Sequence, residues 1–225
     1  MSERILIVIP ALNAEATIGP VVTEARKHLP DVCVVDDGAT DGTSERARQA
    51  GAFTLKHEVN LGKGAALKTG FAYAVANGYD AVITLDADGQ HLASEVPKFI
   101  DALHKTGADL IIGDRSRLFD GMVRRRRLAN RFSSGAISWS SGATVTDTQS
   151  GYRLYSTNLI RSVRIRSNGF AAESEIIVRA GRSGKKIVMI PIELGFVDGL
   201  STSHYKPLLD TLRIAAIVFR TRFFG

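Results

Sequence analysis

The sharpest chemical feature of the sequence is a pair of aspartates separated by one residue. Asp86 and Asp88 follow the apolar run at residues 81–85 and lead to Gln90 in the segment D-A-D-G-Q-H. Because residues two apart on an extended chain project to the same side, we expect the two carboxylates to converge. Converging carboxylates repel unless a proton or cation separates them, and oxygen ligands with phosphates suit Mg²⁺ or Mn²⁺. The alternative is a solvated acidic turn, but the buried run in front favours a metal site.

A second acidic group follows the apolar run at residues 32–35. Asp37, within D-D-G-A-T-D-G-T, is expected to accept hydrogen bonds from a base or ribose. Either Thr40 or Asp41 is expected to cap the helix that follows. The alternative is that these aspartates only form a turn.

Positive charge gathers at two further places. Lys63, in N-L-G-K-G at the start of a predicted helix, could meet a phosphate there, although a tight turn is the simpler interpretation. Residues 122–131 carry five arginines and no acid. Nucleic acid is the obvious rival ligand, but no aromatic residues alternate with these arginines to stack bases. Arginine forks suit pyrophosphate or a lipid phosphate equally well, and we therefore expect no nucleic-acid partner.

Bulk properties exclude several classes of protein. The chain has 225 residues, a formal net charge of +6 and a single cysteine, Cys33. An intramolecular disulfide and a thiolate metal site are therefore excluded. The apolar start is too short for a signal sequence, and no apolar stretch reaches the 18 or so residues of a membrane span. A cytoplasmic location is expected.

The elements that must position these residues alternate along the chain. Short apolar runs predict strands at residues 4–9 (stopped by Pro10), 32–35, 81–85 and 110–112, and helical spacing occurs at residues 16–28, 43–50, 63–77 and 94–105. This alternation predicts an α/β fold, a doubly wound and mostly parallel sheet with helices on both faces. Ligands of such sheets bind at the carboxyl ends of the strands, where the polar segments described above begin.

The ordered succession of these segments resembles a known family. I-P-A-L-N-A-E, V-V-D-D-G-A-T-D-G-T, N-L-G-K-G-A-A-L, L-D-A-D-G-Q-H and I-I-G-D-R together look like family 2 glycosyltransferases, within them the dolichyl-phosphate or polyprenyl-phosphate mannose and glucose synthase group. The resemblance is strong over residues 4–115. It continues through D-T-Q-S-G-Y-R at residues 147–153 and residues 170–175.

The resemblance implies a GT-A nucleotide-sugar-binding fold, inversion at the anomeric carbon and a UDP- or GDP-sugar donor. Leu12 stands where the family's usual P-x-Y-N-E has its aromatic, and Ala14 replaces the acid, with Glu15 beside it. By motif, the implied contacts are Pro10, Leu12 and Asp37 to the nucleoside, Asp86 and Asp88 to the diphosphate through Mg²⁺ or Mn²⁺, Gln90 and Arg115 to the sugar and its phosphates, and Arg127 or Arg131 to an acceptor phosphate.

The acceptor decides whether a protein base is needed. A polyprenyl phosphate arrives as an anion and attacks without one, whereas a hydroxyl of a glycan requires a base within reach. Asp147 is the candidate for that base. A third possibility is a catalytically silent nucleotide-binding module.

The expected domain organisation places a GT-A domain at residues 1–206. Its nucleotide-sugar half spans residues 1–115, and its acceptor half spans residues 116–206. The spacing of apolar and charged residues at 207–225 predicts an amphipathic helix, which either packs on its own domain or lies on a membrane surface. The second alternative would place the protein peripherally at the inner face of the membrane.

Overall fold

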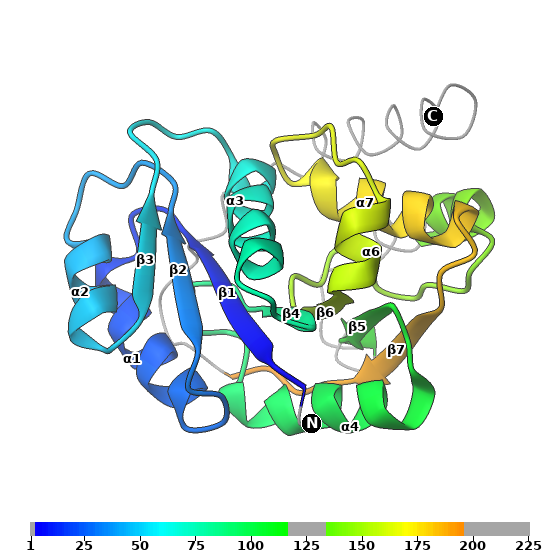
Figure 1. The fold of residues 1–225 in the computed structure, drawn as a ribbon, viewed down its shortest axis with the longest axis horizontal. Helices are drawn as coiled ribbons and strands as arrows, with labels where there is room; N and C mark the ends of the chain where they lie inside the picture. The colour runs from blue at the N-terminus through cyan, green and yellow to red at the C-terminus, as the bar shows by residue number, and fades with distance from the viewer. Residues whose placement is uncertain (1–2, 117–133, 196–225) are drawn as a thin grey trace.

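A mixed sheet forms the centre of the computed structural model, which describes residues 3–116 and 134–195 (Figure 1). The order of its seven strands is β3-β2-β1-β4-β6-β5-β7. β6 runs antiparallel to both of its neighbours, and every other pair is parallel. The strands are β1 (Ile5–Ala11), β2 (Val32–Asp36), β3 (Phe53–Lys56), β4 (Ala81–Thr84), β5 (Leu110–Asp114), β6 (Arg153–Ser156) and β7 (Ile187–Pro191). The mostly parallel sheet predicted from the sequence is confirmed.

Helices cover both faces of the sheet, as predicted. One hydrophobic cluster packs α1, α2 and α4 against one face, and a second packs α3, α6 and α7 against the other. A helix over residues 134–141 joins the second layer through Ile137. The bounds are α1 (Glu15–Arg26), α2 (Thr43–Gln49), α3 (Lys63–Ala76), the short 3₁₀ helix η1 (Ala93–Glu95), α4 (Val96–Thr106), α6 (Thr157–Ser162) and α7 (Ala171–Arg182).

Strand β1 shows why the apolar runs are continuous rather than alternating. Ile5, Ile7 and Ile9 belong to the first cluster, whereas Leu6 and Val8 belong to the second. A central strand with helices on both sides needs apolar residues at every position, because both of its faces are buried.

The expectation that Pro10 stops the first strand is wrong. β1 continues to Ala11, and Pro10 is in register with Val35 of β2. The pairing of β1 with β4 ends at Val8, so beyond that point β1 has a strand neighbour on one side only. Proline is tolerated where a strand lies at an edge, because its missing N–H is not needed there.

Three strands have weaker sequence signals than the four predicted ones. β3 and β7 lie at the two edges of the sheet and are partly exposed, so neither shows a buried run. β6 is only four residues long and begins with the buried Arg153.

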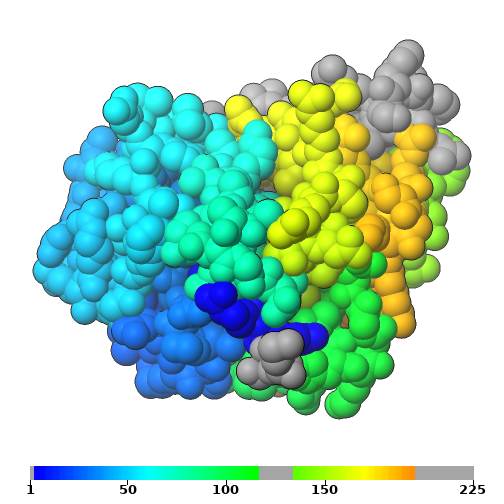
Figure 2. All heavy atoms as spheres, in the orientation of Figure 1, coloured from blue at the N-terminus to red at the C-terminus, as the bar shows by residue number. Residues whose placement is uncertain are grey.

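The two halves of the chain form one continuous body. Figure 2 shows α3 in the middle of the visible face, between the N-terminal strands and the segments of α6 and α7. The backbone N–H of Ala65, in the first turn of α3, donates to the carbonyl of Asn168, ahead of α7, at 3.0 Å. This contact joins the nucleotide-sugar half expected from the sequence to the half that follows it.

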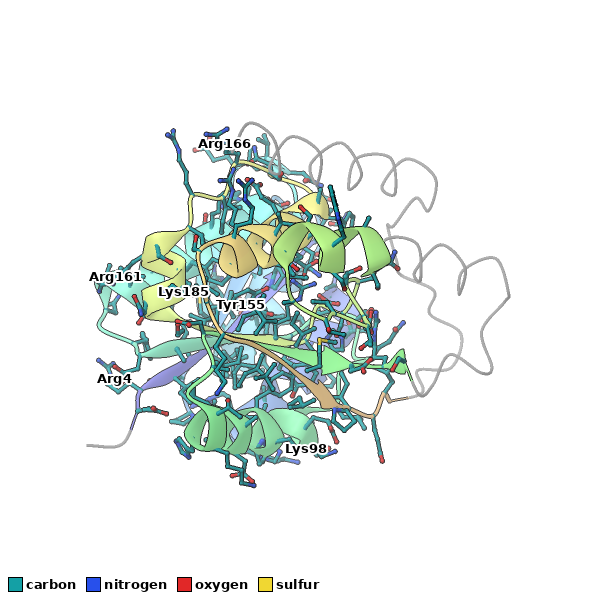
Figure 3. The ribbon with its side chains drawn as sticks, turned by 90° about the vertical axis from the view of Figure 1, so that its right-hand side faces the viewer. Arg4, Lys98, Tyr155, Arg161, Arg166 and Lys185 are labelled. Atoms are coloured by element: carbon teal, nitrogen blue, oxygen red, sulfur yellow. The ribbon has the colours of Figure 1, made fainter. Side chains whose placement is uncertain are left out.

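The arginines of residues 161–166 lie on the outside, as their alternation with other residue types indicates. Arg161, Arg164 and Arg166 are exposed, and Figure 3 shows Arg161 and Arg166 at the surface while Tyr155 lies in the interior. No helix within the described residues is long and apolar enough to cross a membrane.

Candidate active site

The turn that carries the two predicted metal ligands begins where β4 ends. The backbone N–H of Asp86 donates to Nδ1 of His91 at 3.1 Å, and the N–H of Gln90 donates to Oδ1 of Asp88 at 3.0 Å. Gly89 has a φ of +78°, the left-handed conformation that lets the chain reverse so tightly. Burial lowers the pKa of the His91 ring, which keeps it neutral and able to accept the N–H of Asp86. The turn therefore holds both carboxylates at the carboxyl end of the sheet.

Lys63 lies between two carboxylates. Its Nζ is 2.7 Å from Oδ1 of Asp86 and 3.3 Å from Oε1 of Glu173 in α7, and it lies over the ring of Phe170 at 5.9 Å from the ring centroid. Burial alone would lower the pKa of Lys63, but the charges of Asp86 and Glu173 raise it above its ordinary value. Burial alone would raise the pKa of Asp86, but the charge of Lys63 lowers it. Lys63 and Asp86 are therefore both ionised at neutral pH.

The contact expected of Lys63 was a phosphate, and the structure pairs its ammonium with carboxylates instead. The helix N-terminus still places Lys63 at the edge of the sheet where a diphosphate is expected. A phosphate contact of Lys63 remains a prediction.

Gly151 provides the space for this ion pair. A Cβ at Gly151 would lie 2.6 Å from Oδ2 of Asp86 and 2.8 Å from Nζ of Lys63. The carbonyl of Gly151 accepts the hydroxyl of Thr84 at 2.7 Å, which ties the glycine to the end of β4. Its side of the site is therefore formed by backbone alone.

The fully buried Arg153 fixes the backbone around Gly151. Its guanidinium donates to the carbonyls of Thr148, Ser150 and Glu173 at 2.8, 2.7 and 2.8 Å. A buried guanidinium needs such acceptors, because an unpaired buried charge is strongly destabilising. The segment S-G-Y-R and the first turn of α7 are thereby locked to each other.

Arg115 and Asp147 form a bidentate pair. The Nε and Nη2 atoms of Arg115 donate to the two carboxylate oxygens of Asp147 at 2.7 and 3.1 Å. The backbone N–H groups of Arg115 and Gln149 donate to the same carboxylate, which is fully buried. Burial alone would lower the pKa of Arg115, but Asp147 raises it.

This geometry argues against Asp147 as a catalytic base. Both of its oxygens already accept hydrogen bonds, and the side chain has no exposed surface through which a substrate hydroxyl could reach it. Asp147 instead orients Arg115, which keeps 18% of its side chain exposed and points from the end of β5. The role of Arg115 towards the sugar and phosphates remains a prediction.

Asp37 is engaged with the loop that leads into α3. Its Oδ1 is 2.7 Å from Nδ1 of His57 and accepts the N–H of Leu61 at 3.0 Å, and its Oδ2 accepts the N–H of Gly62 at 2.8 Å. The Nε2 atom of His57 lies 2.9 Å from the hydroxyl of Thr69. Asp37 therefore holds the start of α3 in place, and its expected nucleoside contact is still a prediction.

Glu15 connects the start of α1 to the loop before α2 rather than joining the cluster around Asp86. Its Oε2 accepts the N–H of Gly42 at 3.1 Å. Asp41 accepts the N–H of Thr43 at 3.0 Å, but the N-cap residue of α2 is Gly42, without a side-chain cap, so neither Thr40 nor Asp41 occupies the expected capping position. A hollow of about 640 Å³ on this side of the molecule is lined by Asn13, Glu15, Ala16, Gly19, Pro20, Asp41 and Arg46, and by none of the residues of the cluster around Asp86.

Pro10 and Leu12, the other two predicted nucleoside contacts, lie at the end of β1. Both are half-buried, so part of each side chain is accessible. Arg127 and Arg131, the predicted acceptor-phosphate residues, lie outside the described residues, as does the predicted helix at residues 207–225.

The two aspartates of the turn suit a divalent cation that shares its ligands with a substrate. Asp86 is ionised and its side chain is 28% exposed, and Asp88 is half-buried. Among the described residues, no three His, Cys, Asp or Glu side chains gather into a metal-binding group. Mg²⁺ is commonly held by one or two carboxylates plus substrate phosphates and water, and these aspartates fit that pattern.

Comparison with known proteins agrees with this arrangement. The family described as glycosyl transferase family 2 matches residues 6–165, from β1 through α6, including Asp86 and Asp88. This chain belongs to glycosyl transferase family 2. It is accordingly a glycosyltransferase.

Relatives within family 2 include enzymes of the polyprenyl-phosphate group. The chain is 30% identical to an undecaprenyl-phosphate mannosyltransferase of Micrococcus luteus, over 84% of this chain and 82% of the relative. It is also 30% identical to a UDP-N-acetylglucosamine–dolichyl-phosphate N-acetylglucosaminyltransferase of Methanococcus voltae, over 88% of each. The resemblance to this group within family 2 is confirmed.

The fold matches that of solved GT-A enzymes. Glucosyl-3-phosphoglycerate synthase from Mycobacterium tuberculosis, in complex with Mg²⁺ and uridine diphosphate, superposes with a TM-score of 0.73. The alignment covers 100% of this chain and 81% of the synthase at 24% identity. The GT-A fold expected for this family 2 chain is confirmed.

Sequence reasoning missed Glu173 and Gly151 as parts of this site. Glu173 is 110 positions from Lys63 along the chain and reaches it only through the packing of α3 and α7. Gly151 lies in the S-G-Y-R segment, and its place in that resemblance was the one available signal. For a glycine whose role is to leave space, no side-chain chemistry can indicate a function.

Proposed function

We propose that this protein transfers a hexose from a nucleoside-diphosphate sugar to the phosphate of a polyprenyl phosphate, with inversion and with the help of Mg²⁺ or Mn²⁺. The observation that carries the proposal is the turn at the end of β4. Asp86 and Asp88 leave the sheet there beside two cationic side chains, Lys63 and Arg115, each held by a carboxylate. Relatives named for undecaprenyl-phosphate and dolichyl-phosphate substrates support the acceptor.

Different residues at the site would bind different parts of the donor. Asp86 and Asp88 would hold the cation, which when bound neutralises charge on the leaving diphosphate. Arg115, oriented by Asp147, would donate to the donor's phosphates or sugar. Asp37 fixes the loop that begins α3 and so places Lys63. These groups act by positioning charge before the reaction begins.

The hydrogen bonds that Arg115 donates to both oxygens of Asp147 favour a phosphate acceptor over a hydroxyl. A hydroxyl must lose its proton to a base as it attacks, and the base expected for that task is buried and fully hydrogen-bonded. A phosphate monoester has a second pKa near 6 and arrives largely as a dianion. Its oxygen attacks the anomeric carbon, the bond from that carbon to the diphosphate breaks, and no proton transfer is required.

A polyprenyl acceptor lies in a membrane, so the protein must reach the membrane surface. We propose peripheral association at the inner face, through the amphipathic pattern of residues 207–225. Sedimentation with anionic liposomes tests this: the full chain should bind, and a chain ending at Lys206 should not, while it still binds the nucleotide sugar.

The acceptor proposal is tested with matched acceptors. The protein is incubated with Mn²⁺ and UDP- or GDP-linked glucose, mannose or N-acetylglucosamine, together with either a polyprenyl phosphate or the corresponding polyprenol. Transfer to the phosphate alone, giving a β-linked product from an α-linked donor, is the expected result. Equal transfer to the polyprenol would contradict the proposal, and so would retention of the α configuration.

A further inference from the structure

Glu173, the second carboxylate beside Lys63, has no part in the donor contacts described above. We propose that Glu173 is a positioning residue: acting through the Lys63 ammonium, it fixes the Asp86 carboxylate and sets how strongly the site holds its divalent cation. This inference rests on the proposed metal-dependent function. Glu173 itself is too deeply placed to act directly, since its side chain is 7% exposed against 28% for Asp86.

Lys63 contacts Asp86 and Glu173 at the same time, so the three side chains form a chain of charges. Nζ of Lys63 is 2.7 Å from Oδ1 of Asp86 on one side and 3.3 Å from Oε1 of Glu173 on the other. Oε1 of Glu173 is buried and makes no hydrogen bond among the described residues, so its interaction with Lys63 is that of an ion pair. One ammonium is therefore shared by two carboxylates, and its pull on Asp86 depends on Glu173.

The backbone around Glu173 and around Lys63 is fixed by its contacts. The carbonyl of Glu173 accepts from Arg153 at 2.8 Å, which fixes the first turn of α7. The start of α3 packs closely on the same region, because a Cβ at Gly64 would lie 2.6 Å from the Cβ of Ala172. The distance from Lys63 to Glu173 is therefore set by helix packing rather than by flexible side chains.

Opposite changes in cation affinity follow from this arrangement. In Glu173→Gln the Lys63 ammonium has only Asp86 as a charged partner and competes more strongly with a cation there. In Lys63→Met the positive charge beside Asp86 is gone, and the cation binds more tightly. A unit charge roughly 6 Å from a divalent ion changes its affinity by about tenfold even at high dielectric constant. We expect about that loss for Glu173→Gln and about that gain for Lys63→Met.

The double variant separates positioning from simple charge. If Glu173 acts only as one more negative charge, Glu173→Gln weakens cation binding by the same factor with or without Lys63. If it acts through Lys63, the effect of Glu173→Gln becomes several-fold smaller in the Lys63→Met background, where only the direct effect of its own charge remains, since contacting residues give non-additive effects.

The experiment is a Mn²⁺ titration of the full chain followed by electron paramagnetic resonance, with and without UDP or GDP. The matched control is Glu95→Gln, which removes another buried glutamate paired with a lysine, Lys98, at 2.7 Å. The control should leave the Mn²⁺ dissociation constant unchanged.

The outcomes are distinct. Weaker binding in Glu173→Gln, tighter binding in Lys63→Met and a non-additive double variant support the inference. Additive effects, or an unchanged dissociation constant in Lys63→Met, overturn it while leaving the proposed function intact. If Glu173→Gln does not fold, Glu173→Asp, which keeps the charge but withdraws it from Lys63, takes its place in the same comparison. Wild-type protein that binds no Mn²⁺ with either nucleotide contradicts both the inference and the proposed metal dependence.

Discussion

Replacement of Gly151 by alanine perturbs the site through one methyl group. The new Cβ would lie 2.6 and 2.7 Å from the two carboxylate oxygens of Asp86 and 2.8 Å from Nζ of Lys63. Ordinary contacts between such atoms are about 3.5 Å, so Asp86 must move by somewhat less than about 1 Å. No positive φ is found at Gly151, and alanine therefore meets no backbone strain there.

The expected result is a large loss of activity with a modest loss of stability. Misplacing a reacting group by about 1 Å costs on the order of 100-fold in rate, and a displaced Asp86 should lower kcat/KM by roughly 10- to 100-fold. Overpacking by one methyl group costs about 1–3 kcal/mol of unfolding free energy. Sugar transfer and urea unfolding, measured on the same preparation, give the two quantities separately.

Gly19→Ala is the matched control. Gly19 lies within α1, and a Cβ there meets nothing within 4 Å. Alanine there should leave activity unchanged and alter stability by no more than about 1 kcal/mol, because its helix propensity is opposed by the crowding of a Cβ against the following Pro20. Wild-type kcat/KM in Gly151→Ala would refute the assignment of Asp86 to the donor site, because the methyl group cannot be accommodated without moving Asp86 or Lys63.

Three further predictions follow from the pairs around the site and from the residues beyond it. Asp147→Asn should lower unfolding free energy by about 3–5 kcal/mol and reduce transfer, because Arg115 loses its charged partner; a changed pH optimum of kcat would instead indicate a base. Burial alone would raise the pKa of Glu175, but backbone N–H groups and Arg179 lower it, so Glu175 stabilises the fold above its ordinary pKa and loses that effect as pH falls below it. Urea unfolding between pH 6 and 3 should therefore show a steeper loss for the wild type than for Glu175→Gln, and equal slopes would contradict this. Replacing Arg127 and Arg131 together by alanine should raise the KM for polyprenyl phosphate more than the KM for the nucleotide sugar, and an equal rise in both would contradict separate sites.

The sequence predicts the turn at the end of β4 because everything that defines it is local. An apolar run, two carboxylates one residue apart and a following glycine lie within ten positions, and the parallel sheet places the end of each run at one edge. The side chains that pair with these carboxylates cannot be predicted in the same way. Whether Lys63 meets a phosphate or Asp86 depends on the packing of α3 against β4 and α7, which no local pattern encodes.

The role of Asp147 could not be predicted from the local sequence either. Its position before S-G-Y-R suggested a reactive carboxylate, and only the fold reveals that Arg115, 32 positions earlier, takes both of its oxygens. Strand β6 is also set by tertiary context, since four residues beginning with a buried arginine show no strand pattern of their own. Arg153 is buried there because backbone carbonyls satisfy its guanidinium.

The most direct test of the central claim is sugar transfer to polyprenyl phosphate measured for the wild type and for Asp88→Ala, each with Mn²⁺ and with EDTA. We expect transfer by the wild type only when Mn²⁺ is present. We also expect a loss of at least about 100-fold in Asp88→Ala at unchanged thermal stability, because the substitution removes a cation ligand and no core contact. Transfer by the wild type at its full rate in EDTA, or near-normal transfer by Asp88→Ala, would contradict that claim.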